Sequence, residues 1–472
     1  MKEPVTLENY NIKREKIITR NANLLGIVLN GKEQRLDARL AALKKEYRNS
    51  CGGKVPYHVP VLTDQALVGS RLYRFCSMLP KGADLHVHDL SLLPWKEQIE
   101  LLSERDEFCI NTDKIHYDLI RVDAEKEVPK GYCRFRDAMA QGLVTEEELR
   151  TEWTILGAEA KNINVWDWFE ELFVRHAVLS DYPAFAEAYY RKTFRYYIEH
   201  GIYHVEIHLL MLGKAEDSVE YIKTVRRIYY EVKRENPIFH VKIIGAGLKA
   251  DNEHQDASRE CFLNTVYAQE QVKDDFDPEH ITDFVIGYDL INEEDGNLPL
   301  KDFAPMLLQA KEKYPDMHLY MHGGESLSAE NENLVDAYLL GVSRVGHGLN
   351  LYRYPGLLER YARSEICLEV CVISNQTLGY TRDVRSHPAV EYLRRGVAVA
   401  LCSDDPVYQE HETLTDDFFA ATLCWNLDLA DLKQLGINSI MYSGLDSREK
   451  TELLRAYRER WNNFVDEALK LF

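Results

Sequence analysis

Four short polar segments, in separate parts of the chain, hold the residue types that a hydrolytic metal site requires. Each follows an apolar run, and the four are His86-Val87-His88, His322-Gly323-Gly324-Glu325, Gly346-His347-Gly348 and Ser403-Asp404-Asp405. Together they offer three imidazoles and one carboxylate as metal ligands, and they leave a carboxyl group, an imidazole and a second carboxylate for proton transfer. This set of donors predicts the zinc centre of a hydrolase.

The first segment has the spacing of a strand that binds metal. Side chains two residues apart on a strand point to the same face, so His86 and His88 can bind one ion. A single His-x-His pair is as often a half-buried surface feature as a metal site. The three other polar segments give this pair its weight.

The elements that must position these segments recur along the chain. Short β-rich runs end in polar or glycine residues, and each precedes an amphipathic stretch typical of a helix. The runs cover residues 84–89, 203–209, 241–245, 284–290, 319–322, 344–348, 368–373 and 398–403. Eight strand–helix units predict an α/β fold, a (β/α)8 barrel of the TIM type, whose strands would bring the polar segments to one mouth.

Two regions lie outside this alternation. Residues 1–75 include a charged segment, 33–47, whose leucines recur at helical spacing and predict an N-terminal helical extension. This helix could form a homodimer contact or pack against its own barrel, and the sequence favours neither. The barrel is expected over residues 76–472. The connection between its first two strands is far longer than usual, so we expect an inserted subdomain at 106–164.

Composition indicates a large enzyme that acts on a small molecule. The chain has 472 residues, of which 45% are hydrophobic, and can bury a large core. Its net charge of -20 disfavours a nucleic acid or an anionic membrane as partner. We find no bilayer-spanning stretch and no apolar signal-peptide core, and we therefore expect a cytoplasmic protein. The nine cysteines form no CxxC pair, and we expect them to be reduced.

Five segments resemble, in order, the motifs of the adenosine deaminase family. They are residues 78–89, 321–325, 344–348, 369–375 and 403–406. Asp89 directly after the histidine pair, the Trp166-x-x-Phe169-Glu170 segment and the N-terminal extension most resemble the adenosine-deaminase-related growth factor branch. The resemblance covers about residue 70 to the C-terminus.

This resemblance implies a role for each polar residue at the barrel mouth. The family's zinc ligands, for one ion per chain, match His86, His88, His322 and Asp404. Glu325 matches the proton donor to purine N1, His347 the imidazole that orients the attacking hydroxide, and Asp405 the carboxyl group that contacts N7. The implied substrate contacts are Asp89, which would reach the sugar, Gly324, Asn292 and Trp166.

Each of these residues also has an ordinary structural explanation. His347 could be a core histidine, and Glu325 could be the first-turn acid of a helix. An Asp-Asp-Pro sequence is common at helix starts. The remaining histidines and two tryptophans are interpreted as structural, surface or core residues: His204, His208, His240, Trp166 and Trp168.

Two positions depart from the family's pattern where a substrate would be recognised. The family usually has a glycine that meets N3 after its fourth strand, and the matching residue here is Asn292, whose side chain would crowd or re-read the base edge. The growth-factor branch has a sugar-contacting histidine where this chain has Leu248. Lys249 leaves a phosphate-bearing substrate open, and Glu293 and Glu294 argue against it.

The resemblance thus implies zinc-dependent hydrolysis of the 6-amino group of an adenosine-like compound, which yields an inosine-type product and ammonia. The expected partner is a purine nucleoside or nucleotide. Three alternatives stay open. The substrate could be another adenine derivative, such as deoxyadenosine, an adenine nucleotide or an N6-substituted adenosine. The protein could be a signalling or binding protein that keeps the fold, or an amidohydrolase of a non-purine amine or amide.

Overall fold

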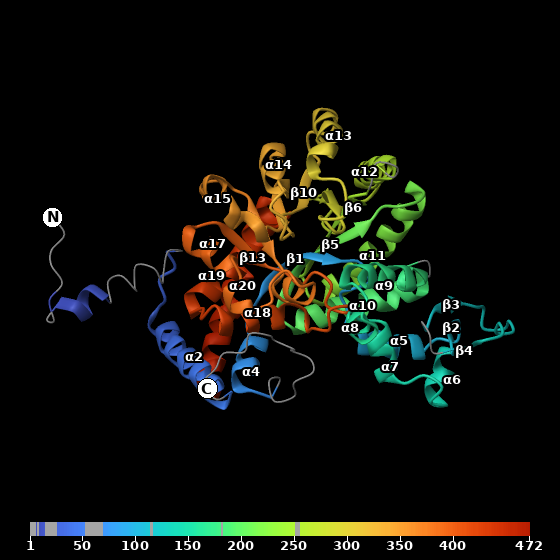
Figure 1. Cartoon of the computed structure of the whole chain (residues 1–472), viewed down its shortest axis with the longest axis horizontal. Coiled ribbons are helices and arrows are strands. Elements are labelled where there is room, and N and C mark those ends of the chain that lie inside the picture. Colours follow the sequence, from blue (N-terminus) through green and yellow to red (C-terminus); the bar gives the residue numbers. More distant parts are fainter. Residues whose placement is uncertain are drawn as a thin grey trace.

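The chain folds around one eight-stranded parallel sheet (Figure 1). The computed structural model describes residues 6, 9–14, 26–51, 69–113, 117–180, 183–250 and 255–472. In sheet order, which is also chain order, the strands are β1 (Gly82–His88), β5 (Ile202–Leu210), β6 (His240–Leu248), β9 (Val285–Ile291), β10 (His318–Gly323), β11 (Arg344–His347), β12 (Cys367–Val370) and β13 (Ala398–Leu401). Every predicted strand overlaps one of them, and the predicted (β/α)8 fold is confirmed.

Main-chain hydrogen bonds at Asp404 join the first and last strands of this sheet. The Asp404 N–H donates to the His86 carbonyl at 2.9 Å, and the His88 N–H donates to the Asp404 carbonyl at 3.1 Å. Val87 and Asp404 form an isolated parallel bridge. Closure of the barrel therefore brings the first and last polar segments of the sequence together.

Helices follow the strands and cover the outer face of the sheet (Figure 1). They include α11 (Ala215–Glu235), α12 (Gln255–Gln271), α13 (Leu300–Lys313), α14 (Asn333–Leu340), α15 (Pro355–Tyr361), α17 (Ala389–Arg395), α18 (Thr413–Cys424), α19 (Leu429–Met441) and α20 (Ser447–Leu471), whereas the short helix α16 (Val372–Thr377) directly follows β12 at the carboxyl ends of the strands. On α11 the residues Val219, Ile222, Val225 and Val232 are buried at helical spacing. Burial of such apolar stripes against the sheet forms the core.

A long insertion separates β1 from β5. It contains α5 (Trp95–Ser103), β2 (Phe108–Asn111), β3 (Leu119–Arg121), β4 (Tyr132–Arg134), α6 (Phe135–Ala140), α7 (Glu146–Glu152), α8 (Leu156–Lys161), α9 (Val165–Ser180) and α10 (Pro183–Glu199). The three strands form an antiparallel sheet in the order β3-β2-β4. Trp168 and Leu172 of α9 share a buried cluster with Tyr408, which follows β13. The insertion therefore contributes to the barrel mouth.

The N-terminal helix α2 (Gly31–Ser50) packs against the C-terminal helices of its own chain, on the opposite side of the barrel from β2–β4 (Figure 1). Leu36, Leu40 and Leu43 are buried, and Glu33 pairs with Lys433 of α19. The short helix α4 (Arg71–Ser77) follows. The rest of the predicted extension, residues 1–5, 7–8, 15–25 and 52–68, lies outside the described residues. The apolar face of α2 is thus used within the chain, and the homodimer stays a prediction.

Two smaller features complete the fold. The strands β7 (Lys273–Asp274) and β8 (Thr282–Asp283) form a two-stranded sheet, and η1 (Leu349–Arg353) and η2 (Val384–Ser386) are short 3-10 helices. The nine cysteines all lie in the described residues, and none of them forms a disulfide bond. Within the described ranges we find no helix of the length and apolar character that crossing a bilayer requires. The cytoplasmic location stays a prediction.

Candidate active site

A cavity of about 1150 Å³ lies at the carboxyl ends of the barrel strands. Seven titratable residues that the sequence assigned to the site line it, together with two histidines that it did not assign, His176 and His208. The seven are His88, Asp89, His322, Glu325, His347, Asp404 and Asp405. Apolar side chains from strand ends and from α9 form a wall: Phe169, Phe173, Leu209, Leu248, Ile291 and Leu378. The four polar segments therefore share one cavity.

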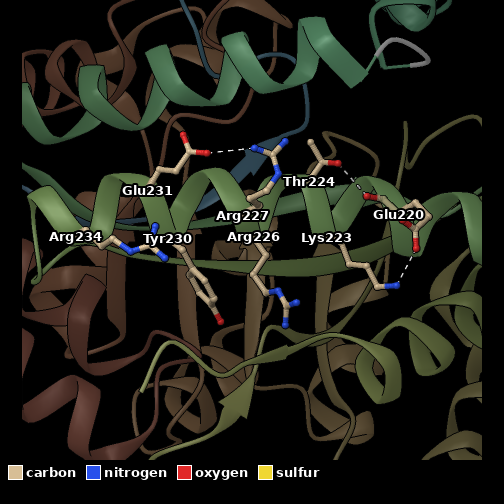
Figure 2. Close-up of a pocket in the computed structure, with 8 residues that line it drawn as sticks. All are labelled: Glu220, Lys223, Thr224, Arg226, Arg227, Tyr230, Glu231 and Arg234. Atoms are coloured by element: carbon tan, nitrogen blue, oxygen red, sulfur yellow. Dashed lines mark hydrogen bonds and ion pairs between the residues drawn. The ribbon is translucent and has the colours of Figure 1, made fainter. Parts of the chain in front are cut away.

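A smaller hollow, of about 470 Å³, lies along α11 and has a different character. Figure 2 shows two ion pairs among its charged side chains, with Lys223 2.7 Å from Glu220 and Arg227 3.2 Å from Glu231. None of the predicted site residues lines it. The chemistry therefore belongs to the larger cavity.

The predicted zinc ligands lie together at its floor. Nitrogen atoms of His86, His88 and His322 lie within 4.8 Å of one another. Asp404 Oδ1 lies 3.3 Å from His88 Nε2 and 3.8 Å from His86 Nε2. His86 Nε2 is buried and has no hydrogen-bond partner among the described residues. These nitrogen and oxygen donors fit the ligand set of catalytic zinc.

Two buried carboxylates orient these imidazoles. Glu369 Oε2 lies 2.8 Å from His86 Nδ1, and Asp289 Oδ2 lies 2.7 Å from His322 Nδ1. Both contacts use Nδ1 and leave Nε2 of each ring to face an ion, as is usual for metal-binding histidines. The ring orientations are therefore set by acids from β9 and β12.

A buried network continues from Glu369 through the barrel. Arg344 contacts both Glu369 and Glu206, and His204 Nε2 lies 2.8 Å from Glu206 Oε1. All four side chains are buried. A buried charge is tolerated when it is paired in this way. His204 therefore has the structural place that the sequence suggested.

The structure corrects the interpretation of His208, which lines the cavity between the two orienting acids. Its Nδ1 lies 2.9 Å from Asp289 Oδ2, and its ring centroid lies 4.6 Å from that of His86. It also forms a close group with His86 and Glu369. His204, Glu206 and His208 are two residues apart on β5 and therefore lie on one strand face. This spacing could have indicated from the sequence that His208 lies beside other polar side chains.

The residues predicted to transfer protons lie beside the ligands. Burial, together with the nearby Asp404 carboxylate, raises the pKa of Glu325 well above its ordinary value. Burial lowers the pKa of His347 well below its ordinary value, and raises the pKa of Asp405. These shifts in pKa favour the protonated form of the Glu325 carboxyl group and the uncharged form of the His347 imidazole. Asp405 Oδ1 is buried and lacks a hydrogen-bond partner within the described parts of the chain.

Three non-glycine residues at strand ends have a left-handed backbone. The φ angles are 66° at His347, 62° at Asp404 and 97° at Asn292. Such conformations are uncommon for these residue types and occur preferentially at functional sites. At Asn292, where the family usually has a glycine, the backbone has a positive φ that glycine adopts more readily than asparagine.

Three of the four predicted substrate contacts line the cavity. Asp89 is half-buried, and its Oδ2 accepts from the Tyr221 hydroxyl at 3.0 Å. Asn292 lies at the end of β9. Trp166 is also half-buried, and its Nε1 donates to the Tyr380 hydroxyl at 2.9 Å. Its neighbour Trp168 is a core residue, as expected.

Gly324 and Lys249 both contact Glu294, which lies after β9. The Gly324 N–H, which we expected near substrate, donates to Glu294 Oε2 at 3.0 Å, and Gly324 is not among the cavity-lining residues. Lys249 is fully buried, donates to the His322 carbonyl at 2.8 Å and lies 3.2 Å from Glu294 Oε1. Its charge neutralises Glu294, so Lys249 is not available to a substrate phosphate.

Sequence reasoning also gave no role to Asn375, which follows β12. Asn375 Nδ2 lies 3.2 Å from Glu325 Oε1 and 3.3 Å from His347 Nδ1. The residue lies within the predicted 369–375 motif, but its partners come from other strands. Its contact with both proton-handling groups follows only from the fold.

The family model described as adenosine deaminase matches residues 150–459. The adenosine deaminase 2 of Dictyostelium discoideum is 27% identical over 99% of this chain and 89% of its own length.

Two solved structures share the fold at low identity. The adenine deaminase of Arthrobacter aurescens aligns with a TM-score of 0.57 and 22% identity, over 80% of this chain and 98% of its own. An amidohydrolase of Burkholderia ambifaria, solved with bound zinc, aligns with a TM-score of 0.57 and 17% identity, over 89% and 99%. The match to the family model covers more than half of the sequence, and the chain therefore belongs to the adenosine deaminase family, on its adenosine deaminase 2-type branch, and is a hydrolytic deaminase.

Proposed function

We propose that the protein is a zinc-dependent deaminase that hydrolyses the 6-amino group of adenosine or a close adenine nucleoside and releases ammonia. One observation carries this proposal. Glu325, whose pKa is raised by burial, His347, whose pKa is lowered by burial, and the buried carboxyl group of Asp405 line the cavity beside three imidazoles and one carboxylate.

The metal would be held by four side chains, which are His86, His88, His322 and Asp404. Zinc bound there would supply hydroxide near neutral pH, because it lowers the pKa of water to about 7. The orientation of two of these ligands, His86 and His322, is maintained by Glu369 and Asp289, whose carboxylates contact His86 Nδ1 and His322 Nδ1. Preorganised ligands require no rearrangement during the reaction.

Two carboxyl groups would bind and activate the purine ring. Glu325, kept protonated by burial, would donate a proton to N1, which makes C6 more electrophilic. Asp405, whose pKa burial also raises, would donate a hydrogen bond to N7. His347 would orient the attacking hydroxide at C6. Hydroxide would add to C6 and form the new C–O bond. The proton of that hydroxyl group would pass to the amino group, and the C–N bond would break, which releases ammonia and leaves the 6-oxo product with the donated proton on N1.

The cavity favours a nucleoside over a nucleotide. None of the described residues that line it is lysine or arginine. Its charged lining outside the floor is acidic and includes Asp89, Glu170, Asp217 and Glu220. A phosphate dianion would therefore meet carboxylates without a compensating cation. Asp89, which accepts a hydrogen bond from the Tyr221 hydroxyl, is the proposed contact to the sugar.

A substrate panel tests the function directly. The zinc-loaded protein is assayed with adenosine, 2′-deoxyadenosine, N6-methyladenosine, AMP and adenine, and deamination is followed by ultraviolet absorbance. We expect the best nucleoside to exceed AMP at least about tenfold in kcat/KM, in line with the loss expected for an unpaired buried charge. A preference for AMP would overturn the choice of nucleosides. Absence of deamination for all five compounds would overturn the function.

Metal removal tests the zinc requirement in the same assay. Dialysis against a chelator should abolish deamination, and addition of one equivalent of Zn²⁺ should restore it. Full activity in protein shown by elemental analysis to be free of transition metals would contradict the proposed role of zinc.

A further inference from the structure

His387 lies between η2 and α17, behind the catalytic groups, and its proton position can be assigned. The Ala389 N–H donates to His387 Nδ1 at 3.1 Å, and His387 Nε2 lies 3.2 Å from Asn375 Oδ1. The side chain is buried, and burial lowers its pKa to about 3. The ring is therefore uncharged and carries one proton. Because Nδ1 accepts from a backbone N–H, that proton is on Nε2.

This proton fixes the orientation of the Asn375 amide. The His387 Nε2–H needs an acceptor, so the oxygen of the amide faces His387 and its nitrogen faces the cavity groups. The reversed amide would place N–H groups against each other and leave buried donors without acceptors, which costs about 1–3 kcal/mol for each group. The backbone N–H of Ala389 thus determines which end of Asn375 points toward the active site.

The amide nitrogen in turn restricts the two catalytic groups. Asn375 Nδ2 lies 3.2 Å from Glu325 Oε1 and 3.3 Å from His347 Nδ1, and an amide nitrogen can only donate. Both facing atoms must therefore accept. A single ring proton on His347 therefore lies on Nε2, and a proton on the Glu325 carboxyl group lies on Oε2.

We propose that His387 is a positioning residue which, through Asn375, fixes the atoms of Glu325 and His347 that carry protons. This inference rests on the proposed deaminase function. In the resulting arrangement Glu325 has a defined O–H to donate to the purine. His347 has an N–H to donate to the attacking oxygen, so it acts as a hydrogen-bond donor and not as a base. The hydrogen bonds from Ala389 through His387 to Asn375 thus link a backbone N–H to the proton positions of Glu325 and His347.

Two substitutions at position 387 separate hydrogen bonding from packing. His387→Phe keeps a ring against Trp425, which lies 5.2 Å away between centroids, and removes the donor. His387→Gln loses the ring and keeps an N–H donor near the place of Nε2. We expect kcat to fall about 10–100-fold in His387→Phe, the usual effect of losing an outer hydrogen-bond partner, and to stay near wild type in His387→Gln. The opposite order would show a packing role and overturn the proposal.

A measurement independent of activity reads the proton positions. In zinc-loaded protein labelled with ¹⁵N-histidine, imidazole nitrogen shifts distinguish the two tautomers. We expect His347 to be protonated on Nε2 in the wild type and to populate both tautomers in His387→Phe. A wild-type His347 protonated on Nδ1 would overturn the proposal. This result can be obtained even if no adenine nucleoside is a substrate, so failure of the inference and failure of the function are distinguishable.

Two further variants guard against unfolding and assignment errors. If His387→Phe does not fold, Asn375→Asp replaces the donor nitrogen by an oxygen of the same shape and should give the same fall in kcat. Normal kcat and tautomers in Asn375→Asp would overturn the proposal. The matched control is His240→Gln, because His240 is also buried but contacts Lys233 and Glu449 away from the cavity. We expect His240→Gln to leave the His347 tautomer unchanged, and a change there would also count against the proposal.

Discussion

The floor and the wall of the cavity are held in place by different forces. At the floor, His86 and His322 each pair with a buried carboxylate, and Glu325 contacts an amide whose orientation is itself fixed. The wall is formed by apolar side chains such as Phe173 and Leu248, which are positioned by packing. Hydrogen-bonded networks specify one arrangement, whereas apolar packing tolerates substitution of similar volume. Changes at the wall should therefore alter substrate choice while the chemistry persists.

Loss of a zinc ligand should have the largest effect on the floor. His88→Ala removes one of four donors, and we expect loss of both bound zinc and deamination. Elemental analysis and the absorbance assay check the two outcomes. The wall should remain, so the melting temperature of the metal-free variant should match that of metal-free wild type. Stoichiometric zinc in active His88→Ala would contradict the ligand assignment.

Loss of the proton donor Glu325 should have the second largest effect on turnover. Glu325→Gln keeps the shape of the side chain and cannot give a proton to the ring, so we expect a fall in kcat of about 10²–10⁴-fold with zinc retained. The matched control is Glu293→Gln, since Glu293 is half-buried near the cavity but does not line it. We expect the kcat of Glu293→Gln to stay near that of the wild type. Near-normal turnover in Glu325→Gln, or loss of its zinc, would refute the role given to Glu325.

The same contrast explains what could be predicted from the sequence. Strand-end residues such as His86, Asp404 and Glu325 stand in short local segments whose order follows the barrel, and closure of the barrel brings them together. The partners that orient these residues lie far from them in the sequence. Glu369 pairs with His86 across 283 positions, and no local pattern indicates that contact.

The roles of Lys249, His208 and Trp166 also depend on contacts that are distant in the sequence. Lys249 follows a strand end, where a lysine side chain could reach a substrate, and only the fold shows that Glu294 and the His322 carbonyl bind it. The sequence assigns His208 no role in the site because it belongs to no motif, although its spacing predicts that it shares a strand face with His204 and Glu206. The long insertion was evident from its length, but the position of Trp166 at the wall depends on tertiary packing.

His208 offers a test within the floor. His208→Phe keeps the ring and removes both nitrogens beside Asp289, so the acids that orient the zinc ligands lose a buried partner. We expect zinc affinity to weaken about 10–100-fold, measured by competition with a chelator. His176→Phe is the control from the wall, where His176 Nδ1 contacts the Leu172 carbonyl. Equal zinc affinities in the two variants would show that floor and wall do not differ in this way.

Asn292 should show the smallest effect and tests the wall. The side chain lines the cavity at the end of β9, from a backbone with φ of 97° that glycine adopts more readily. Asn292→Gly removes bulk beside the proposed place of purine N3 and relaxes that backbone. We expect preference to shift toward adenosine, relative to the best modified adenine nucleoside, by about 1 kcal/mol or about fivefold in the ratio of kcat/KM values. Zinc content should stay the same, and the melting temperature should not fall. An unchanged ratio would mean that the Asn292 side chain points away from the base, and that substrate choice is made elsewhere on the wall.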